Sequence, residues 1–420
     1  MTDTAADTHA AEPQPRDTFL SRLGRRIDGL LNPILVKEIR QAVSGKYLTV
    51  VFILFLVLQL AAVGFFVVLS NRLNAGSGRE LYAILVPILF FVCMILVPLM
   101  ACFRMGAERA GTNIDLMYIT TLRPWAIVRG KVLSTAALTL VIYSSFVPFI
   151  TFSYLLRGVE LQAIVLTLGL GFLLVLLCIQ HAITTAALAI AITPNPVFRF
   201  LFGLIVFSPV PSCFIFAMQG SFLIVEADFI AASDPNFWPA IGTLVGVIAL
   251  LFGVTHTVAV ALVAAPSANR TLPLRVYMLA MWLATLGICL GWFYSIDPPS
   301  DWGEEVLGAT YIWGIHMIVF LTLLMLVSIG ERLRPSRRVS RRIPRGPLRP
   351  LAFVFYHGGS GGLVFCGGMV AATLLTMHYI SNVVFANRPS SLDAEDMTRP
   401  FNTLLIVVLF VVVCVGVAWL

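Results

Sequence analysis

Ten stretches of this sequence contain no aspartate, glutamate, lysine or arginine, and each is 18 residues or longer. A helix of roughly 20 apolar residues crosses the ~30 Å hydrocarbon core of a membrane. The stretches are continuous rather than alternating as in barrel strands, and backbone in lipid must satisfy its own hydrogen bonds. The sequence therefore predicts an all-α, polytopic helical membrane protein with about 10 transmembrane helices. The stretches cover residues 48–70, 81–102, 132–155, 161–192, 200–217, 238–264, 276–293, 306–328, 361–380 and 402–420.

Composition excludes other classes of protein. Hydrophobic residues make up 59% of the chain and charged residues 12%, which excludes a water-soluble enzyme. The first 47 residues are polar and basic, and the 23-residue apolar run after them is too long for the core of a cleaved signal peptide. All seven cysteines lie inside uncharged stretches, which indicates neither a disulfide framework nor a metal site. We expect no cofactor.

The connections between the stretches alternate between two compartments. One set holds 23 of the 28 lysines and arginines. Because basic connections stay on the inner side of a membrane, we expect this set to be cytoplasmic, in an integral plasma membrane protein with both termini inside. The basic charge is distributed as insertion requires, so we expect no nucleic-acid partner. The opposite connections are short, so function is expected in the spans or on the inner face.

The spans carry little chemistry. They lack the acidic or basic residues that ion-coupled transporters place at membrane depth. Four histidines remain, and a lone intramembrane histidine more often bonds to a neighbouring helix than relays protons. The chain has no GxxxxGK[ST] phosphate loop and no cytoplasmic connection longer than 47 residues. We therefore expect no enzyme, and an energy source on another subunit. The histidines are His181, His256, His316 and His378.

An amphipathic elbow segment, residues 16–47, precedes the first span. Apolar side chains recur at helical spacing over Phe19 to Leu31 with arginines between them, which is typical of an interfacial helix. Asn32 and Pro33 then form a cap and a first helical position for a second short helix over Ile34 to Ala42. The alternative is a plain basic flank that orients the first span. The second helix carries Lys37, Glu38 and Arg40.

The connection between the second and third spans predicts a short cytoplasmic helix. Gly111 ends the incoming helix, and Thr112 caps the next one with Asp115 three residues further on. Pro124 then begins the helix of the third span. A capped helix with charged and apolar sides suits docking against another protein. The alternative is that it packs only on this chain's own elbow segment.

At these two places the sequence resembles the permease subunits of type-2 ATP-binding-cassette (ABC) exporters. The elbow pattern of that family is matched by Asn32, Pro33, Lys37 and Glu38. Its loop pattern, Glu-Arg, then Gly-Thr, then an acid and leucine, is matched in order, although Thr121 stands where proline is common. The likeness covers residues 15 to about 264. The matching loop residues are Glu108, Arg109, Gly111, Thr112, Asp115 and Leu116.

The resemblance implies a function and partners. The loop would be the coupling element against which a separate ATP-binding-cassette ATPase subunit presses, and the chain would be the permease of an exporter. A second permease copy or homologue and membrane lipids are the other expected partners. The implied organisation is a disordered tail (1–15), the elbow segment (16–47), a six-span unit (48–264), spans seven and eight (265–330), an Arg/Pro-rich cytoplasmic loop (331–350) and spans nine and ten (351–420).

Two other functions stay open at this point. A non-transporting membrane scaffold would use the same inner face to recruit partner proteins. A facilitator or ion-coupled carrier would rely on the intramembrane histidines. The Arg/Pro-rich loop either holds anionic lipid headgroups or only controls topology.

Overall fold

The computed structural model is predominantly helical in the part of the chain that it describes. That part comprises residues 33–69, 77–110, 123–192, 195–226, 237–265, 267–296, 302–329, 331, 336–341, 343–344, 346–347, 349–356 and 358–386. These residues are 91% helical and include no strand, and they form nine helices long and apolar enough to cross a membrane. The predicted all-α polytopic class is confirmed. The predicted tenth span (402–420) and the first elbow helix (Phe19 to Leu31) lie outside the described residues.

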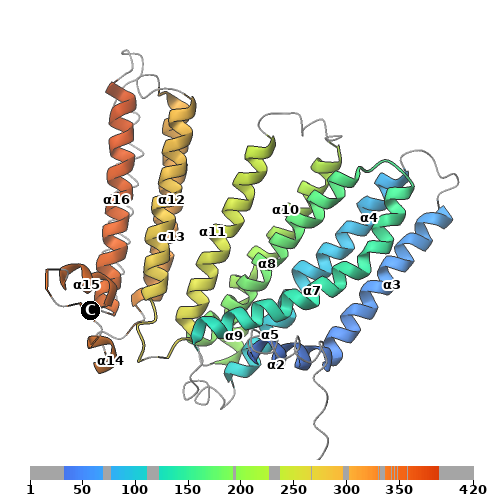
Figure 1. Ribbon diagram of the computed structural model, residues 1–420, viewed down its shortest axis with the longest axis horizontal. Helices are drawn as coiled ribbons and strands as arrows, with labels where there is room; N and C mark the ends of the chain where they lie inside the picture. Colours follow the sequence, from blue (N-terminus) through green and yellow to red (C-terminus); the bar gives the residue numbers. More distant parts are fainter. Residues whose placement is uncertain are drawn as a thin grey trace, which may run out of the picture.

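The first six spans form one bundle (Figure 1). The second span is a continuous helix made of three parts, and the fifth is a pair of helices that meet at Ser208. A shared apolar core joins the helices of this bundle. In chain order the elements are α2 (Pro33–Val43), α3 (Lys46–Leu69), α4 (Ser77–Phe91), the π-helix η1 (Val92–Leu96), α5 (Val97–Ala110), α7 (Pro124–Leu155), α8 (Leu161–Ile192), α9 (Pro196–Phe207), α10 (Pro209–Glu226) and α11 (Phe237–Val263).

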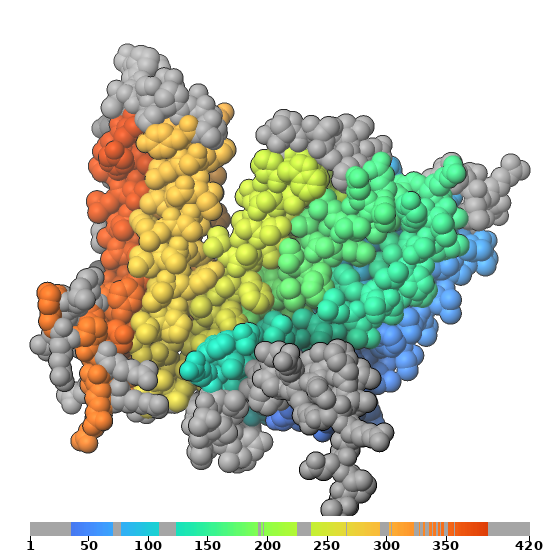
Figure 2. Space-filling model, in the orientation of Figure 1, coloured from blue at the N-terminus to red at the C-terminus, as the bar shows by residue number. Residues whose placement is uncertain are grey.

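The remaining elements form a second group beside α11. They are α12 (Leu272–Ile296), α13 (Glu304–Ile329), the short helices α14 (Arg337–Ser340) and α15 (Arg349–Tyr356), and α16 (Gly359–Ala386). A separate apolar cluster joins this group to Val254 and Val258 of α11. The two groups touch toward the end that carries α2 and are separated by a notch at the other end (Figure 2). The predicted domain boundaries stay a prediction.

Prolines set several helix boundaries. Pro33 begins α2 and Pro124 begins α7, where the sequence predicts helices to start. At α9 the side chain of Asn195 accepts a hydrogen bond from the Val197 amide at 2.9 Å, and Pro196 occupies the first helical position. This is the cap geometry that Asn32 and Pro33 predict for α2, but Asn32 lies outside the described residues.

A π-helical turn interrupts the second span. The amide of Val97 bonds to the carbonyl of Val92, five residues earlier, and Pro98 follows directly. Proline has no N–H, and its ring clashes with the carbonyl four residues before it, so a wider turn relieves that clash. Most of this turn is buried among the neighbouring helices. The second span therefore carries a local irregularity near its middle, between α4 and α5, and α5 continues in the bundle against α8.

Basic side chains gather at the end of the bundle that carries α2. Among the described residues, Arg79 and Arg157 are the basic side chains at the opposite end, and Arg79 Nε donates to the carbonyl of Gly158 at 3.4 Å. The other described lysines and arginines lie in α2, α14 or α15, or at the ends of neighbouring helices on the same side of the bundle. The charge grouping expected from the connections is thus present in the fold. Which side of a membrane this end faces stays a prediction.

Two of the four histidines join neighbouring helices, as the sequence predicts. His181 Nε2 lies 2.7 Å from the carbonyl of Val206 in α9. His256 Nδ1 of α11 lies 3.1 Å from Gln180 Oε1 of α8, so this ring nitrogen is the donor. The other two behave differently: His316 bonds to a carbonyl of its own helix, and His378 contacts Asn382 one turn on. Each of the four rings thus has a hydrogen-bond partner on a neighbouring helix or on its own helix.

Candidate functional site

The helix α2 lies across the end of the six-span bundle (Figure 1). It packs mainly against α7 and turns into α3 at Ser44 and Gly45. Its inner face carries Glu38, which is 4% exposed, and Ala42 one turn later, while Lys37 and Arg40 are exposed. An acidic side chain thus stands where an apolar one would normally face a bundle. A buried carboxylate requires charged or polar partners.

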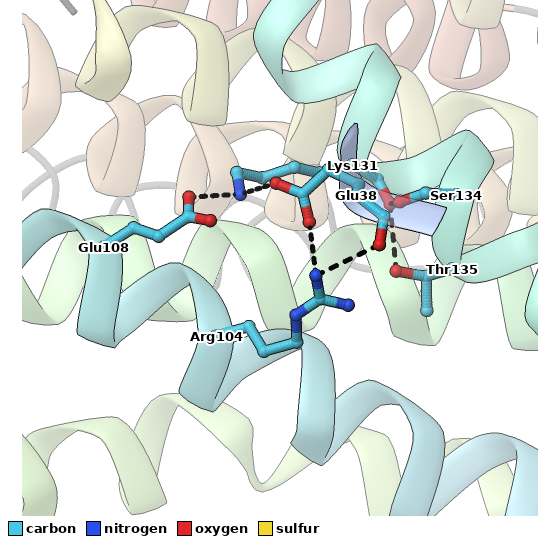
Figure 3. A network of polar contacts seen from close by, with 6 residues as sticks. All are labelled: Glu38, Arg104, Glu108, Lys131, Ser134 and Thr135. Carbon is cyan, nitrogen blue, oxygen red and sulfur yellow. Dashed lines mark hydrogen bonds and ion pairs between the residues drawn. The ribbon is translucent and has the colours of Figure 1, made fainter. Parts of the chain in front are cut away.

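Glu38 has two cationic partners from two different helices (Figure 3). Arg104 of α5 donates through Nη2 to Glu38 Oε2 at 2.8 Å and to the Glu38 carbonyl at 3.3 Å. Lys131 of α7 donates through Nζ to Glu38 Oε1 at 2.5 Å. Both carboxylate oxygens are therefore used, one by each helix. Glu38 ties the elbow to the second and third spans at once.

Lys131 also pairs with Glu108, near the end of α5 (Figure 3). Glu108 and Lys131 stand on either side of the connection that the sequence predicts to hold the coupling helix. Their ion pair joins the helix before that connection to the helix after it, and Glu38 links this ion pair to α2. We call the four side chains Glu38, Arg104, Glu108 and Lys131 the elbow network. It contains two positive and two negative charges.

The elbow network is tightly packed. A cavity of about 10 Å³ lies among Glu38, Arg104, Lys131 and neighbouring apolar side chains. This is at the lower limit of the about 10–15 Å³ that a water molecule needs. The side chain of Lys131 is 7% exposed and that of Glu38 is 5% exposed, whereas Glu108 is 32% exposed. The charges near Glu38 are therefore compensated mainly by one another rather than by solvent.

Two hydroxyl groups support Lys131 from its own helix. Ser134 Oγ and Thr135 Oγ1 each donate to the Lys131 carbonyl at 2.9 Å, and both residues are buried. At the start of the same helix, the guanidinium of Arg129 stacks on Trp125 at 4.4 Å from the ring centre. The first turns of α7 are thus held by local contacts in addition to the ion pairs.

The structure brings together two of the residues singled out from the sequence. Glu38 from the elbow pattern and Glu108 from the loop pattern share Lys131 as a partner. Pro33 begins α2, and Lys37 points away from the network as an exposed side chain. Arg109 lies in α5, but its side chain is outside the described residues. Also outside them are Asn32, Gly111, Thr112, Asp115 and Leu116.

Sequence reasoning selected neither Arg104 nor Lys131 as a site residue. Arg104 is the first charged residue after the second uncharged stretch, and Glu108 follows four residues later. Residues four apart share a helix face, so this spacing indicates that both belong to one site. Glu38, one of the two partners of Lys131, is 93 residues away in sequence, and no local pattern reveals such a pairing.

A second buried ion pair lies at the base of α12. Arg275, 1% exposed, donates through Nη2 to Glu331 Oε2 at 3.1 Å and to the carbonyl of Gly358 at 2.9 Å. Glu331 also accepts from the amides of Arg270 and Thr271. This pair fastens the segment after α13 and the start of α16 to α12. Backbone groups and the Thr271 hydroxyl supply the other hydrogen bonds of the two side chains, which is typical of a structural role.

Within the described part of the chain, no group of three or more His, Cys, Asp or Glu side chains has the arrangement of a metal site. The six cysteines found there are free thiols. Comparison with family models, with curated proteins and with solved structures finds no match to this chain. The elbow network and its position therefore carry the functional argument.

Proposed function

We propose that this chain is the permease subunit of an ABC exporter, driven by a separate ATPase subunit. The observation that supports this most is the elbow network. It connects both ends of the predicted coupling segment to the elbow helix through buried ion pairs of 2.5 and 2.8 Å. A force on that segment would reach three helices through these contacts. The chain itself would not be an enzyme.

The proposed mechanism is mechanical. ATP binding in the ATPase subunit displaces the segment between α5 and α7, with Thr112, Asp115 and Leu116 at the contact. Because Glu108 and Lys131 flank the segment, the displacement moves α5 and α7 together. Glu38 transmits it to α2 and so to α3, and the spans tilt between inward and outward openings. The π-helical turn of the second span is a place where that helix would bend.

The proposal includes an assembly and an orientation. The end that carries α2 would face the cytoplasm of a plasma membrane protein, with both termini inside. A second permease copy or homologue would complete the transporter. The basic grouping around α2, α14 and α15 supports this orientation through the positive-inside rule.

Affinity capture from native membranes tests the proposal. The tagged chain, purified in mild detergent, should retain a protein that mass spectrometry identifies as a P-loop ATPase. Asp115→Ala and Leu116→Ala should reduce that recovery, and Arg40→Gln, an exposed position on α2, should not. Recovery of other proteins without any ATPase would favour the scaffold hypothesis and contradict the proposal.

A second experiment separates binding from transmission. A reporter cysteine at Ser144 of α7 should change its labelling rate when ATP is added to the captured complex. Glu38→Gln should keep the ATPase bound and abolish that change, because the elbow loses its ionic contact with the coupling segment. A Glu38→Gln complex with an unaltered response would show that the elbow network does not transmit movement.

A further inference from the structure

A groove of about 450 Å³ opens beside the elbow network. It lies between the corner where α2 turns into α3 and the last turns of α5. Its volume falls within the ~300–1,000 Å³ of pockets that bind small molecules. The groove adjoins a charged network at one end of a transmembrane bundle, which is the depth at which lipid headgroups are found. Its lining residues are Gln41, Ala42, Gly45, Lys46, Tyr47, Leu48, Met100, Phe103, Arg104 and Ala107.

The lining carries positive charge and no acid. Lys46 is exposed at the start of α3, and Arg104 of α5 faces the same groove. Both hydrogen bonds from Arg104 to Glu38 use Nη2. A guanidinium has five N–H donors, so Nε and Nη1 are left without an acceptor among the described residues. Two cations with donors to spare match an anionic group such as a phosphate.

Apart from Gln41 and the Tyr47 hydroxyl, the rest of the lining is apolar, and it continues onto an exposed apolar surface. Phe103 is 55% exposed at the groove, and Val50, one turn into α3, is 61% exposed. Further along α3, Ile53 and Val57 are also more than half exposed. An exposed apolar stripe on a helix of this length is expected to face acyl chains. A water-soluble anion would gain nothing from this stripe, whereas a phospholipid would use both parts.

We propose that the groove binds one anionic phospholipid of the leaflet at this end of the bundle. Its phosphate and charged headgroup lie against Lys46 and Arg104, and its acyl chains run along Phe103 and the exposed stripe of α3. Because Arg104 also holds Glu38, the bound headgroup extends the elbow network by one charge. The site stands independently of the proposed transport function, since it rests on the groove, its charges and the apolar stripe of α3.

Native mass spectrometry of the purified full chain tests this site. The probes are dioleoyl phosphatidylglycerol and dioleoyl phosphatidylcholine, added to detergent micelles. We expect retention of one phosphatidylglycerol in preference to phosphatidylcholine. Lys46→Gln should weaken retention about fivefold, because one basic residue near a membrane surface contributes ~1 kcal/mol toward anionic lipid. Ala107→Leu, which fills the groove from an exposed helix position and keeps both cations, should weaken it as well.

Lys37→Gln is the matched control, because it removes the same charge from an exposed position of α2 outside the groove. It should leave retention unchanged. Equal losses in Lys46→Gln and Lys37→Gln would mean unspecific surface charge and would overturn the site. Equal retention of both lipids, or a second protein chain in place of lipid, would overturn it too. Circular dichroism of each variant shows that the helices are intact, so loss of binding is not loss of fold.

Discussion

Replacing Lys131 with methionine tests how much the elbow network contributes to the free energy of unfolding. The ammonium of Lys131 is almost fully buried and pairs with Glu38 at 2.5 Å and with Glu108. Methionine keeps an unbranched apolar stem with good helix propensity, so the change removes mainly the charge. Breaking a buried ion pair costs about 3–5 kcal/mol because the remaining charge lacks compensation. Arg104 still holds Glu38, so we expect the lower end, about 3 kcal/mol.

The free energy of unfolding in mixed micelles, from a titration with sodium dodecyl sulfate, measures this effect. Arg40→Met is the control, since Arg40 is exposed and such changes stay within about 0.5 kcal/mol. The double variant Lys131→Met/Glu38→Gln should lose less than the sum of the single losses, by about 1–3 kcal/mol. Additive losses, or a Lys131→Met variant as stable as Arg40→Met, would refute the assignment of a buried network.

Two further predictions concern packing and the second helix group. A Cβ atom on Gly78 would lie 2.1 Å from the carbonyl oxygen of Arg157, so Gly78→Ala should destabilise the chain by several kcal/mol. Gly64 has open space around it, so Gly64→Ala should be neutral or stabilise the chain by about 0.5–1 kcal/mol. Circular dichroism during thermal unfolding distinguishes the two alanine variants, and equal melting would contradict the close approach. Glu331→Gln leaves buried Arg275 without a counter-charge and should cost about 3 kcal/mol in the same detergent titration. A loss below about 0.5 kcal/mol would mean that backbone carbonyls alone satisfy Arg275.

The spans could be predicted from the sequence because their signal is compositional. A continuous apolar stretch of about 20 residues that spans a membrane satisfies its backbone hydrogen bonds as a helix, whatever its neighbours are. Helix starts could also be predicted from the sequence where a proline stands at the first helical position, as at Pro124. The fifth span shows that composition does not predict a break within a span. The stretch 200–217 predicts a single helix, but the structure has α9 and α10, which meet at Ser208 before Pro209.

The candidate site could be predicted only in part from the sequence. The resemblance to a permease family drew attention to Glu38 and Glu108, yet nothing local shows that Glu38 is buried. Its burial depends on Arg104 and Lys131, which lie 66 and 93 residues further along the chain. The π-helical turn before Pro98 could not be predicted either, because a proline indicates an irregularity in a helix without specifying its geometry. Long-range pairing and local register both depend on tertiary packing.

Site-specific photo-crosslinking tests most directly whether the segment between α5 and α7 receives work from an ATPase. A photoreactive amino acid at Asp115, in native membranes, should form an adduct that mass spectrometry identifies as a P-loop ATPase. The same amino acid at Asp228, in a connection expected on the opposite side of the membrane, should form none. Absence of an ATPase adduct at Asp115, or labelling of that position by a membrane-impermeant reagent from outside the cell, would contradict the proposed function.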